Sequence, residues 1–217
     1  MKVTTLACIQ GAWLPEIEPK KALDIGAGTG LLSHMTVQRY QCEIDAVEIE
    51  ADAFTQLNEN TARNPWKSKI NCIHENIIDF ANHTSKRYDF IISNPPFFQN
   101  QLYSTDSKIN QARHDKSLEI QDLVSVCSKL ISNSGKISIL LPPYETKKLD
   151  DQSKRFSLFI SNQLIIHDSE KKPPKAIVTI LSRNTSNPVV EKLIIKNKNG
   201  QYSAQFISLL RDYYLSL

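Results

Sequence analysis

Four consecutive residues, Asn94-Pro95-Pro96-Phe97, follow an apolar run from Tyr88 to Ser93 that is typical of a buried strand. In open α/β sheets, ligands bind at the carboxyl ends of the strands. The two prolines have no N–H group, so this segment offers backbone carbonyls as acceptors. The side-chain amide of Asn94 and the carbonyl of Pro95 could accept both hydrogens of an amino group on a planar ring, and Phe97 could stack on that ring. The motif therefore indicates a site for an exocyclic amino group, of which adenine N6 is the commonest biological example.

Asparagine and proline also form ordinary surface turns, so the tetrapeptide alone leaves that alternative open. A second motif upstream favours the ligand site. A short strand over 21–25 and a helical run over 31–39 enclose a glycine-rich turn, Gly26, Gly28 and Gly30. Strand, glycine turn and helix are the layout of a nucleotide site, because glycines allow a tight turn and close approach of the ligand.

Two acids accompany the glycine turn and indicate what kind of ligand it holds. Asp24 precedes the first glycine by two residues, where a carboxylate would repel a pyrophosphate but suits a ligand with a cationic end, such as S-adenosylmethionine. Glu48 ends a second strand, 44–48, where it could accept hydrogen bonds from both ribose hydroxyls; an exposed strand-end acid is the alternative. Asn76 follows a third strand, 70–74, where an adenine ring would be flanked.

Taken together, these motifs resemble the S-adenosylmethionine-dependent methyltransferases that modify amino groups. More narrowly, the chain is similar to the bacterial tRNA (adenine-N6)-methyltransferases, which act on the adenine just after the anticodon of valine tRNA. The similarity covers most of the chain and includes these further segments: Met1-Lys2-Val3, Gly11-Ala12-Trp13, Phe98, Ala112-Arg113-His114, Ser117-Leu118, Lys172-Pro173-Pro174-Lys175 and Tyr202 to Leu215. In two respects the chain departs from the family, which usually carries an aspartate at the place of Leu6 and a further stretch ahead of Met1.

The resemblance implies direct methyl transfer from S-adenosylmethionine to adenine N6 in valine tRNA, with no metal and no covalent intermediate. Arg113 and His114 are expected to contact RNA, with plain surface residues as the alternative. The basic excess lies late in the chain, where residues 146–217 hold 12 Lys/Arg against 6 Asp/Glu. A basic face suits a polyanion, and Lys171, Lys172 and Lys175 are the expected RNA contacts; a lysine-rich solvated surface is the alternative.

Three other functions stay open at this point. The same chemistry could act on an rRNA or DNA adenine or on a protein glutamine, although glutamine-modifying relatives typically have Tyr where this chain has Phe97. A non-catalytic RNA-binding protein could keep the fold, against which the intact Asn94 and glycine turn argue. A nicotinamide-dependent oxidoreductase is disfavoured by the spacing of the glycines and by Asp24.

The composition limits the possible number of domains and the possible cellular compartment. With 217 residues and 41% hydrophobic content, the chain can bury a full core and is expected to form one domain over 1–217. No apolar stretch is long enough to span a bilayer. The four cysteines are widely spaced, so neither zinc nor disulfides are expected, and a reducing cytoplasm fits. A monomer is expected.

Strands and helices alternate along the chain, which predicts an α/β fold: a Rossmann-like, doubly wound sheet of seven mostly parallel strands. Helices are expected over 51–63, 117–132 and 145–162, and Gly135 is expected to open a strand over 136–141. Two late strands, 163–167 and 176–181, are joined by too few residues for a crossover helix, so the last pair should be antiparallel. The polar segment 98–116 is expected to face the substrate.

Overall fold

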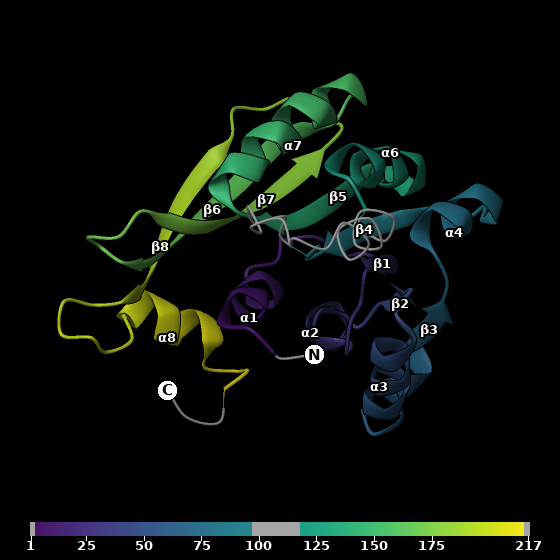
Figure 1. The fold of residues 1–217 in the computed structure, drawn as a ribbon, viewed down its shortest axis with the longest axis horizontal. Helices are drawn as coiled ribbons and strands as arrows, with labels where there is room; N and C mark the ends of the chain where they lie inside the picture. Colours follow the sequence, from purple (N-terminus) through teal and green to yellow (C-terminus); the bar gives the residue numbers. More distant parts are fainter. Residues whose placement is uncertain (1–2, 97–117, 215–217) are drawn as a thin grey trace, which may run out of the picture.

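The computed structural model describes residues 3–96 and 118–214, which contain one mixed sheet with helices on both faces (Figure 1). The first half comprises α1 (Thr5–Ala12), β1 (Lys21–Ile25), α2 (Leu31–Tyr40), β2 (Glu43–Glu48), α3 (Ala51–Ala62), a short 3-10 helix (Lys67–Lys69), β3 (Ile70–His74), α4 (Ile77–His83) and β4 (Tyr88–Ser93). The second half comprises α6 (Ile120–Leu130), β5 (Ile131–Leu141), α7 (Pro143–Arg155), β6 (Phe159–Ser169), β7 (Pro174–Ser182), β8 (Val189–Lys196) and α8 (Ala204–Leu210).

The strand order is β3-β2-β1-β4-β5-β7-β6-β8, so the described residues form eight strands and not the expected seven. The additional strand is β8, which pairs in parallel with β6 at the edge of the sheet. Its sequence signal is weak because only its second half is buried, whereas Val189 and Val190 are each 55% exposed. The expected reversal is confirmed: β7 is antiparallel to both β5 and β6, and no other described strand runs against the rest.

Two predicted helices extended too far. The helix expected to reach Ser132 ends at Leu130, and β5 begins at Ile131 instead of Lys136. The register between β4 and β5 shifts here, and Gly135 lies inside the irregularity instead of opening the strand. A Cβ on Gly135 would come within 3.0 Å of the Tyr88 carbonyl oxygen, so glycine is needed for the backbones to approach. Likewise, the helix expected over 145–162 ends at Arg155, and Phe159 already belongs to β6.

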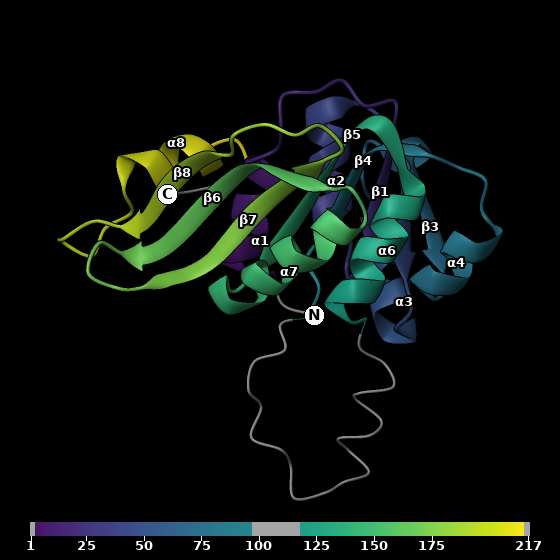
Figure 2. The same cartoon turned by 90° about the horizontal axis from the view of Figure 1, so that it is seen from above.

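The two faces of the sheet are covered as a doubly wound fold requires. One face packs against α4, α6 and α7, where Phe80, Leu123 and Leu149 join the buried strand residues. The other packs against α2 and α3 under β1 and β2, and against α1 and α8 under the second half of the sheet. Figures 1 and 2 show the two groups of helices on opposite sides of the strands. No helix among the described residues is long and apolar enough to cross a membrane.

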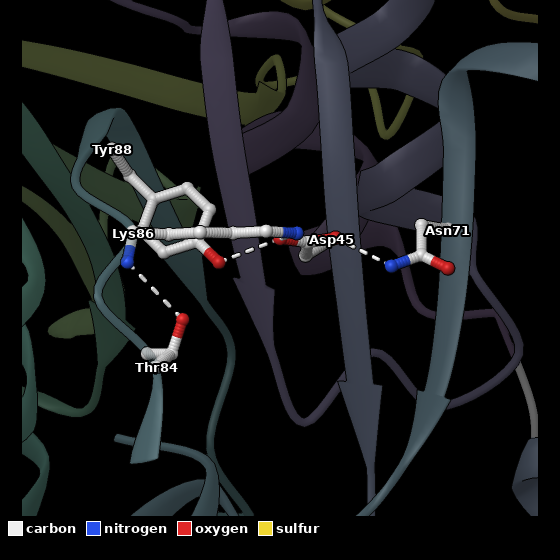
Figure 3. A network of polar contacts seen from close by, with 5 residues as sticks. All are labelled: Asp45, Asn71, Thr84, Lys86 and Tyr88. Atoms are coloured by element: carbon white, nitrogen blue, oxygen red, sulfur yellow. Dashed lines mark hydrogen bonds and ion pairs between the residues drawn. The ribbon is translucent and has the colours of Figure 1, made fainter. Parts of the chain in front are cut away.

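A buried carboxylate ties three strands together toward their amino ends. Asp45 of β2 accepts hydrogen bonds from Asn71 of β3 (2.7 Å), Lys86 (2.7 Å) and Tyr88 of β4 (2.6 Å), as Figure 3 shows. Burial alone would raise the pKa of the Asp45 carboxyl, but these donors outweigh it and hold the pKa below its ordinary value. A cleft of about 330 Å³ opens beside the network. This amino edge lies opposite the edge where Asn94 follows β4.

Replacement of Asp45 by alanine should destabilise the fold by about 3 kcal/mol. Breaking a buried ion pair from one side costs about 3–5 kcal/mol, and the lower end applies because Lys86, with 46% of its side chain exposed, can return to water. Urea unfolding measures the change, with Tyr88→Phe, which removes one donor, as the control. A loss for Asp45→Ala no greater than for Tyr88→Phe would contradict the assignment. Because the folded pKa is lowered, the stabilisation should be complete above about pH 4 and fade as the pH falls further.

Candidate active site

The glycine turn after β1 has a backbone that other residues rarely adopt. Gly26, Gly28 and Gly30 have φ values of 70°, 58° and 90°. The N–H groups of Gly26 and Ala27 both donate to the Val47 carbonyl at 3.0 Å, which anchors the turn to β2. A Cβ on Gly26 would meet no atom within 4 Å, whereas one on Gly30 would come within 2.7 Å of Leu57. The turn is thus packed on one side and leaves an open side at Gly26, where a ligand could approach the backbone.

Asp24 is a fully buried carboxyl whose two oxygens differ. Its Oδ2 accepts a hydrogen bond from the Ser33 hydroxyl at 2.6 Å, whereas Oδ1 has no partner among the described residues. Burial raises the pKa of Asp24 to about 7; the charge of Glu48 acts in the same direction, and the Ser33 hydrogen bond opposes both. A buried acceptor without a donor is costly, and a cationic N–H group would satisfy it.

Glu48 has a structural role that its position in the sequence did not indicate. Only 6% of the residue is exposed, and its two oxygens accept backbone hydrogen bonds from Gly28 (2.7 Å) and Glu50 (2.8 Å). The carboxylate therefore holds the glycine turn in place. Each carboxylate oxygen can accept more than one hydrogen bond, so Glu48 keeps capacity for a ligand hydroxyl at the carboxyl end of β2.

Beyond β3, Asn76 caps the N-terminus of α4, where its side-chain oxygen accepts from the N–H of Ile78 at 2.8 Å. Two exposed apolar side chains accompany it: Ile49, directly after Glu48, is 46% exposed, and Ile78 is 38% exposed. Sequence reasoning missed both isoleucines, although an apolar residue directly after a strand-end acid was a usable signal. They provide apolar surface for a flat ring at this edge.

Asn94 lies directly beside the glycine turn. Its preceding residue, Ser93, pairs with Ile25, which precedes Gly26, and neighbouring strands lie about 4.8 Å apart. β1 and β4 are the strands at which the chain order reverses, which is where open α/β sheets bind ligands. Asn94 is half-buried, and its side chain forms no hydrogen bond with the described part of the chain. An amide without a hydrogen bond to residues 3–96 or 118–214 thus adjoins a nucleotide-type turn.

The remaining members of the motif are placed only in part. Pro95 is buried and Pro96 is exposed, whereas Phe97 lies outside the described residues. So do Arg113, His114 and the segment 98–116, so the stacking and RNA contacts expected of them stay predictions.

Comparison with known proteins decides the family. The chain is 37% identical to the tRNA1(Val) (adenine(37)-N6)-methyltransferase of Dyadobacter fermentans, over 99% of this chain and 91% of that protein. It is 33% identical to the protein of the same name from Mannheimia succiniciproducens, over 100% of this chain and 88% of that one. The chain belongs to this family. The methyltransferase small domain, matched over residues 11–135, contains both the glycine turn and the Asn94 motif.

Solved structures of other methyltransferases share this fold. A predicted O-methyltransferase from Agrobacterium tumefaciens superposes with a TM-score of 0.70 over 95% of both chains at 12% identity. A glycopeptide N-methyltransferase solved with S-adenosyl-L-methionine gives 0.59 over 82% of this chain and 92% of that chain at 10% identity. The likeness confirms the expected class I methyltransferase fold.

The lysines expected to contact RNA lie at the turn between β6 and β7. Lys175 contacts Asp168 at 2.9 Å and Lys172 contacts the same carboxylate at 3.6 Å, while Lys171 occupies the turn itself. Since β6 runs in the direction of β5, this turn lies at the carboxyl edge, as Asn94 does. Three strand spacings separate β6 from β4, about 14 Å.

The remaining candidates have structural roles. Leu6, where the family usually carries aspartate, packs against the cluster of α1 and α8. The cysteines are free thiols; Cys8, Cys42 and Cys127 are buried, and burial raises the pKa of Cys127 to about 12. Within 3–96 and 118–214, no group of three or more His, Cys, Asp or Glu side chains could hold a metal ion.

Proposed function

We propose that this chain transfers a methyl group from S-adenosylmethionine to N6 of the adenine next to the anticodon of a valine tRNA. The position of the Asn94 amide beside the glycine turn carries the proposal, because it brings an acceptor for an amino group to a nucleotide-type site. Full-length relatives that bear this activity in their names support the substrate.

The residues present fit the cofactor. The unpartnered Oδ1 of Asp24 would accept from its ammonium group, the open side of Gly26 would admit its methionine portion, and Glu48 would accept from the ribose hydroxyls. Ile49 and Ile78 would flank the adenine, with Asn76 at its edge. When bound, S-adenosylmethionine supplies an activated methyl group on a sulfonium.

The chain's own residues position the acceptor amine. The side-chain oxygen of Asn94 and the carbonyl of Pro95 would accept the two N6 hydrogens, which draws the nitrogen lone pair out of conjugation with the ring. Phe97 is expected to stack on the base and to favour the positive charge that develops on nitrogen. The product ammonium is acidic enough to lose its proton to water, so no protein base is needed. An unpaired loop base reaches such a pocket at low cost.

The carboxyl edge also carries the positive charge that a tRNA requires. Seven lysines lie along it, at the start of α7, in the β6–β7 turn and at the end of β8: Lys147, Lys148, Lys171, Lys172, Lys175, Lys196 and Lys198. Asp168 and Glu170 neutralise only part of this charge. The lysines therefore extend from the proposed base pocket toward the outer strands, where the rest of an anticodon arm would lie.

Replacing Lys171, Lys172 and Lys175 together by alanine should weaken tRNA binding. It should also flatten the dependence of log Kd on log salt by up to about 3 units, since each phosphate contact contributes about one unit. Filter binding at several salt concentrations measures both effects. A matched control is the triple variant of Lys21, Lys67 and Lys69, which lie at or near the opposite edge of the sheet. Equal losses in the two variants would show that the β6–β7 turn makes no special contact.

Mass spectrometry of nucleosides from purified valine tRNA, with and without the protein, tests the substrate. We expect N6-methyladenosine to appear only with active protein and only at the base beside the anticodon. Methylation of rRNA, DNA or a protein glutamine in parallel reactions, with unmodified valine tRNA, would keep the chemistry and overturn the substrate.

We further propose that residues 1–217 form one domain that acts as a cytoplasmic monomer. The glycine turn, Asn94 and the lysines all lie on one sheet edge of a single chain, and tRNA is the proposed substrate.

A further inference from the structure

A glutamine is buried where an apolar residue would be expected. Gln10 lies on α1 in the apolar sequence Leu-Ala-Cys-Ile-Gln, and its side chain is fully buried against the sheet. Its amide nitrogen donates to the Ser93 carbonyl at 3.0 Å, and it lies 3.3 Å from both the carbonyl and the hydroxyl of Ser138. Two of these partners are carbonyls that can only accept, which fixes the NH2 group on that side.

Ser93 continues the connection toward the cofactor turn. Its hydroxyl donates to the Ile25 carbonyl at 2.9 Å, and its own carbonyl accepts from Gln10. Ser93 directly precedes Asn94, and Ile25 directly precedes Gly26. A chain of hydrogen bonds, Ser138–Gln10–Ser93–Ile25, therefore crosses β5, β4 and β1 immediately beneath the two loops of the site.

The stability of the fold does not explain why a glutamine, and not an apolar residue, is buried at position 10. Its side-chain oxygen is buried and has no partner in the described part of the chain, and an unsatisfied buried acceptor destabilises a protein. A leucine of similar size would fill this site without that cost. Departures of this kind from good packing concentrate where function constrains the fold, and the parallel ladders already hold the three strands side by side. What the chain of hydrogen bonds adds is a fixed position for the last residue of β4.

We infer that Gln10 and Ser93 are positioning residues for methyl transfer, which fix Asn94 relative to the glycine turn. The inference rests on the proposed function. Direct transfer requires the amine to approach along the axis of the breaking bond, and a displacement of about 1 Å can lower the rate about 100-fold. The hydrogen bonds from Gln10 and to Ile25 hold Ser93 from both sides, and so fix the point from which Asn94 leaves the sheet.

Steady-state kinetics of Ser93→Ala and Gln10→Leu test the inference. We expect kcat to fall about 10- to 100-fold in each variant, with the KM for tRNA and the calorimetric Kd for S-adenosylmethionine within about twofold of the wild type. Ser161→Ala is the matched control: Ser161 is also buried, and its hydroxyl donates to the Ile180 carbonyl on the neighbouring strand, far from β4. Its kcat should be unchanged.

The double variant and a conservative replacement separate positioning from folding. If the two residues act through one chain of hydrogen bonds, the kcat losses should be less than multiplicative in Ser93→Ala/Gln10→Leu. Ser93→Thr, which keeps the hydroxyl, should recover most of the activity. Losses confined to melting temperature, or no greater than those of Ser161→Ala, would overturn the inference. Wild-type inactivity on valine tRNA would instead count against the proposed substrate, and the same ratios could be measured on whichever substrate is methylated.

Discussion

Replacing Asn94 by alanine is expected to lower kcat for methyl transfer by about two to three orders of magnitude, the usual effect of removing one preorganised hydrogen-bonding group from an active site. Without the side-chain oxygen, the amino group keeps only the Pro95 carbonyl as acceptor. Its nitrogen lone pair is then no longer directed at the methyl group. Binding of S-adenosylmethionine should be nearly unchanged, since Asn94 contacts neither Gly26 nor Glu48 through any hydrogen bond.

Two further variants sharpen this measurement. Asn94→Asp keeps an acceptor oxygen and should retain far more activity than Asn94→Ala. Asn58→Ala is the control, because Asn58 is an exposed residue of α3 whose amide donates within its own helix, to the Phe54 carbonyl. Single-turnover rates with saturating cofactor provide the comparison. Full turnover by Asn94→Ala would show that the Asn-Pro-Pro segment is merely a turn.

The Asp24→Asn variant should lose measurable S-adenosylmethionine binding and at the same time become more stable above pH 7. Ionised Asp24 is the acceptor that a ligand ammonium would need, and asparagine has no charge to offer. In the free protein, however, ionisation of this buried group is unfavourable, as its pKa of about 7 shows. Because the folded pKa is raised above the ordinary value of about 4, stability falls as the pH rises from about 4 to 7, by a few kcal/mol in total. Asparagine removes that loss.

Proton release provides an independent check on Asp24. A cationic ligand favours the ionised carboxylate, so binding at pH 6 should release close to one proton and binding near pH 7.5 much less. Affinity should rise as the pH increases from 6 to about 7. Calorimetry in buffers of different ionisation enthalpy measures the proton count. Unchanged affinity in Asp24→Asn, together with no proton release at pH 6, would remove Asp24 from the site.

The sequence was most informative about strands whose ends are set by residues adjacent in the chain. The bounds of β1, β3 and β4 were predicted correctly, since each apolar run is ended by glycine, by polar residues or by proline. The excess length of two predicted helices had a non-local cause. Ile131 pairs with Tyr88 of β4 and Phe159 pairs with Ser182 of β7, and this pairing places both residues in strands.

The sequence indicated candidate site residues but not the contacts between them. Asp24, Glu48 and Asn94 could be named from their places at strand ends, because the carboxyl edge of a parallel sheet is set by the order of elements. Glu48 accepts a hydrogen bond from Gly28, 20 positions away, and Gln10 donates one to Ser93, 83 positions away. No periodicity in the sequence predicts contacts between residues so far apart.

The reversed direction of β7 has an evolutionary consequence. Because β6 and β7 are joined by a tight turn at the carboxyl edge, and not by a crossover helix, the segment that carries the proposed RNA contacts Lys171 and Lys172 belongs to no layer of the core. Lengthening such a turn costs only about 0.6 kcal/mol for each doubling of its length. Selection can thus change how far the protein reaches along its substrate, or which substrate it meets, by insertions there, while the chemistry at β1 and β4 is inherited unchanged.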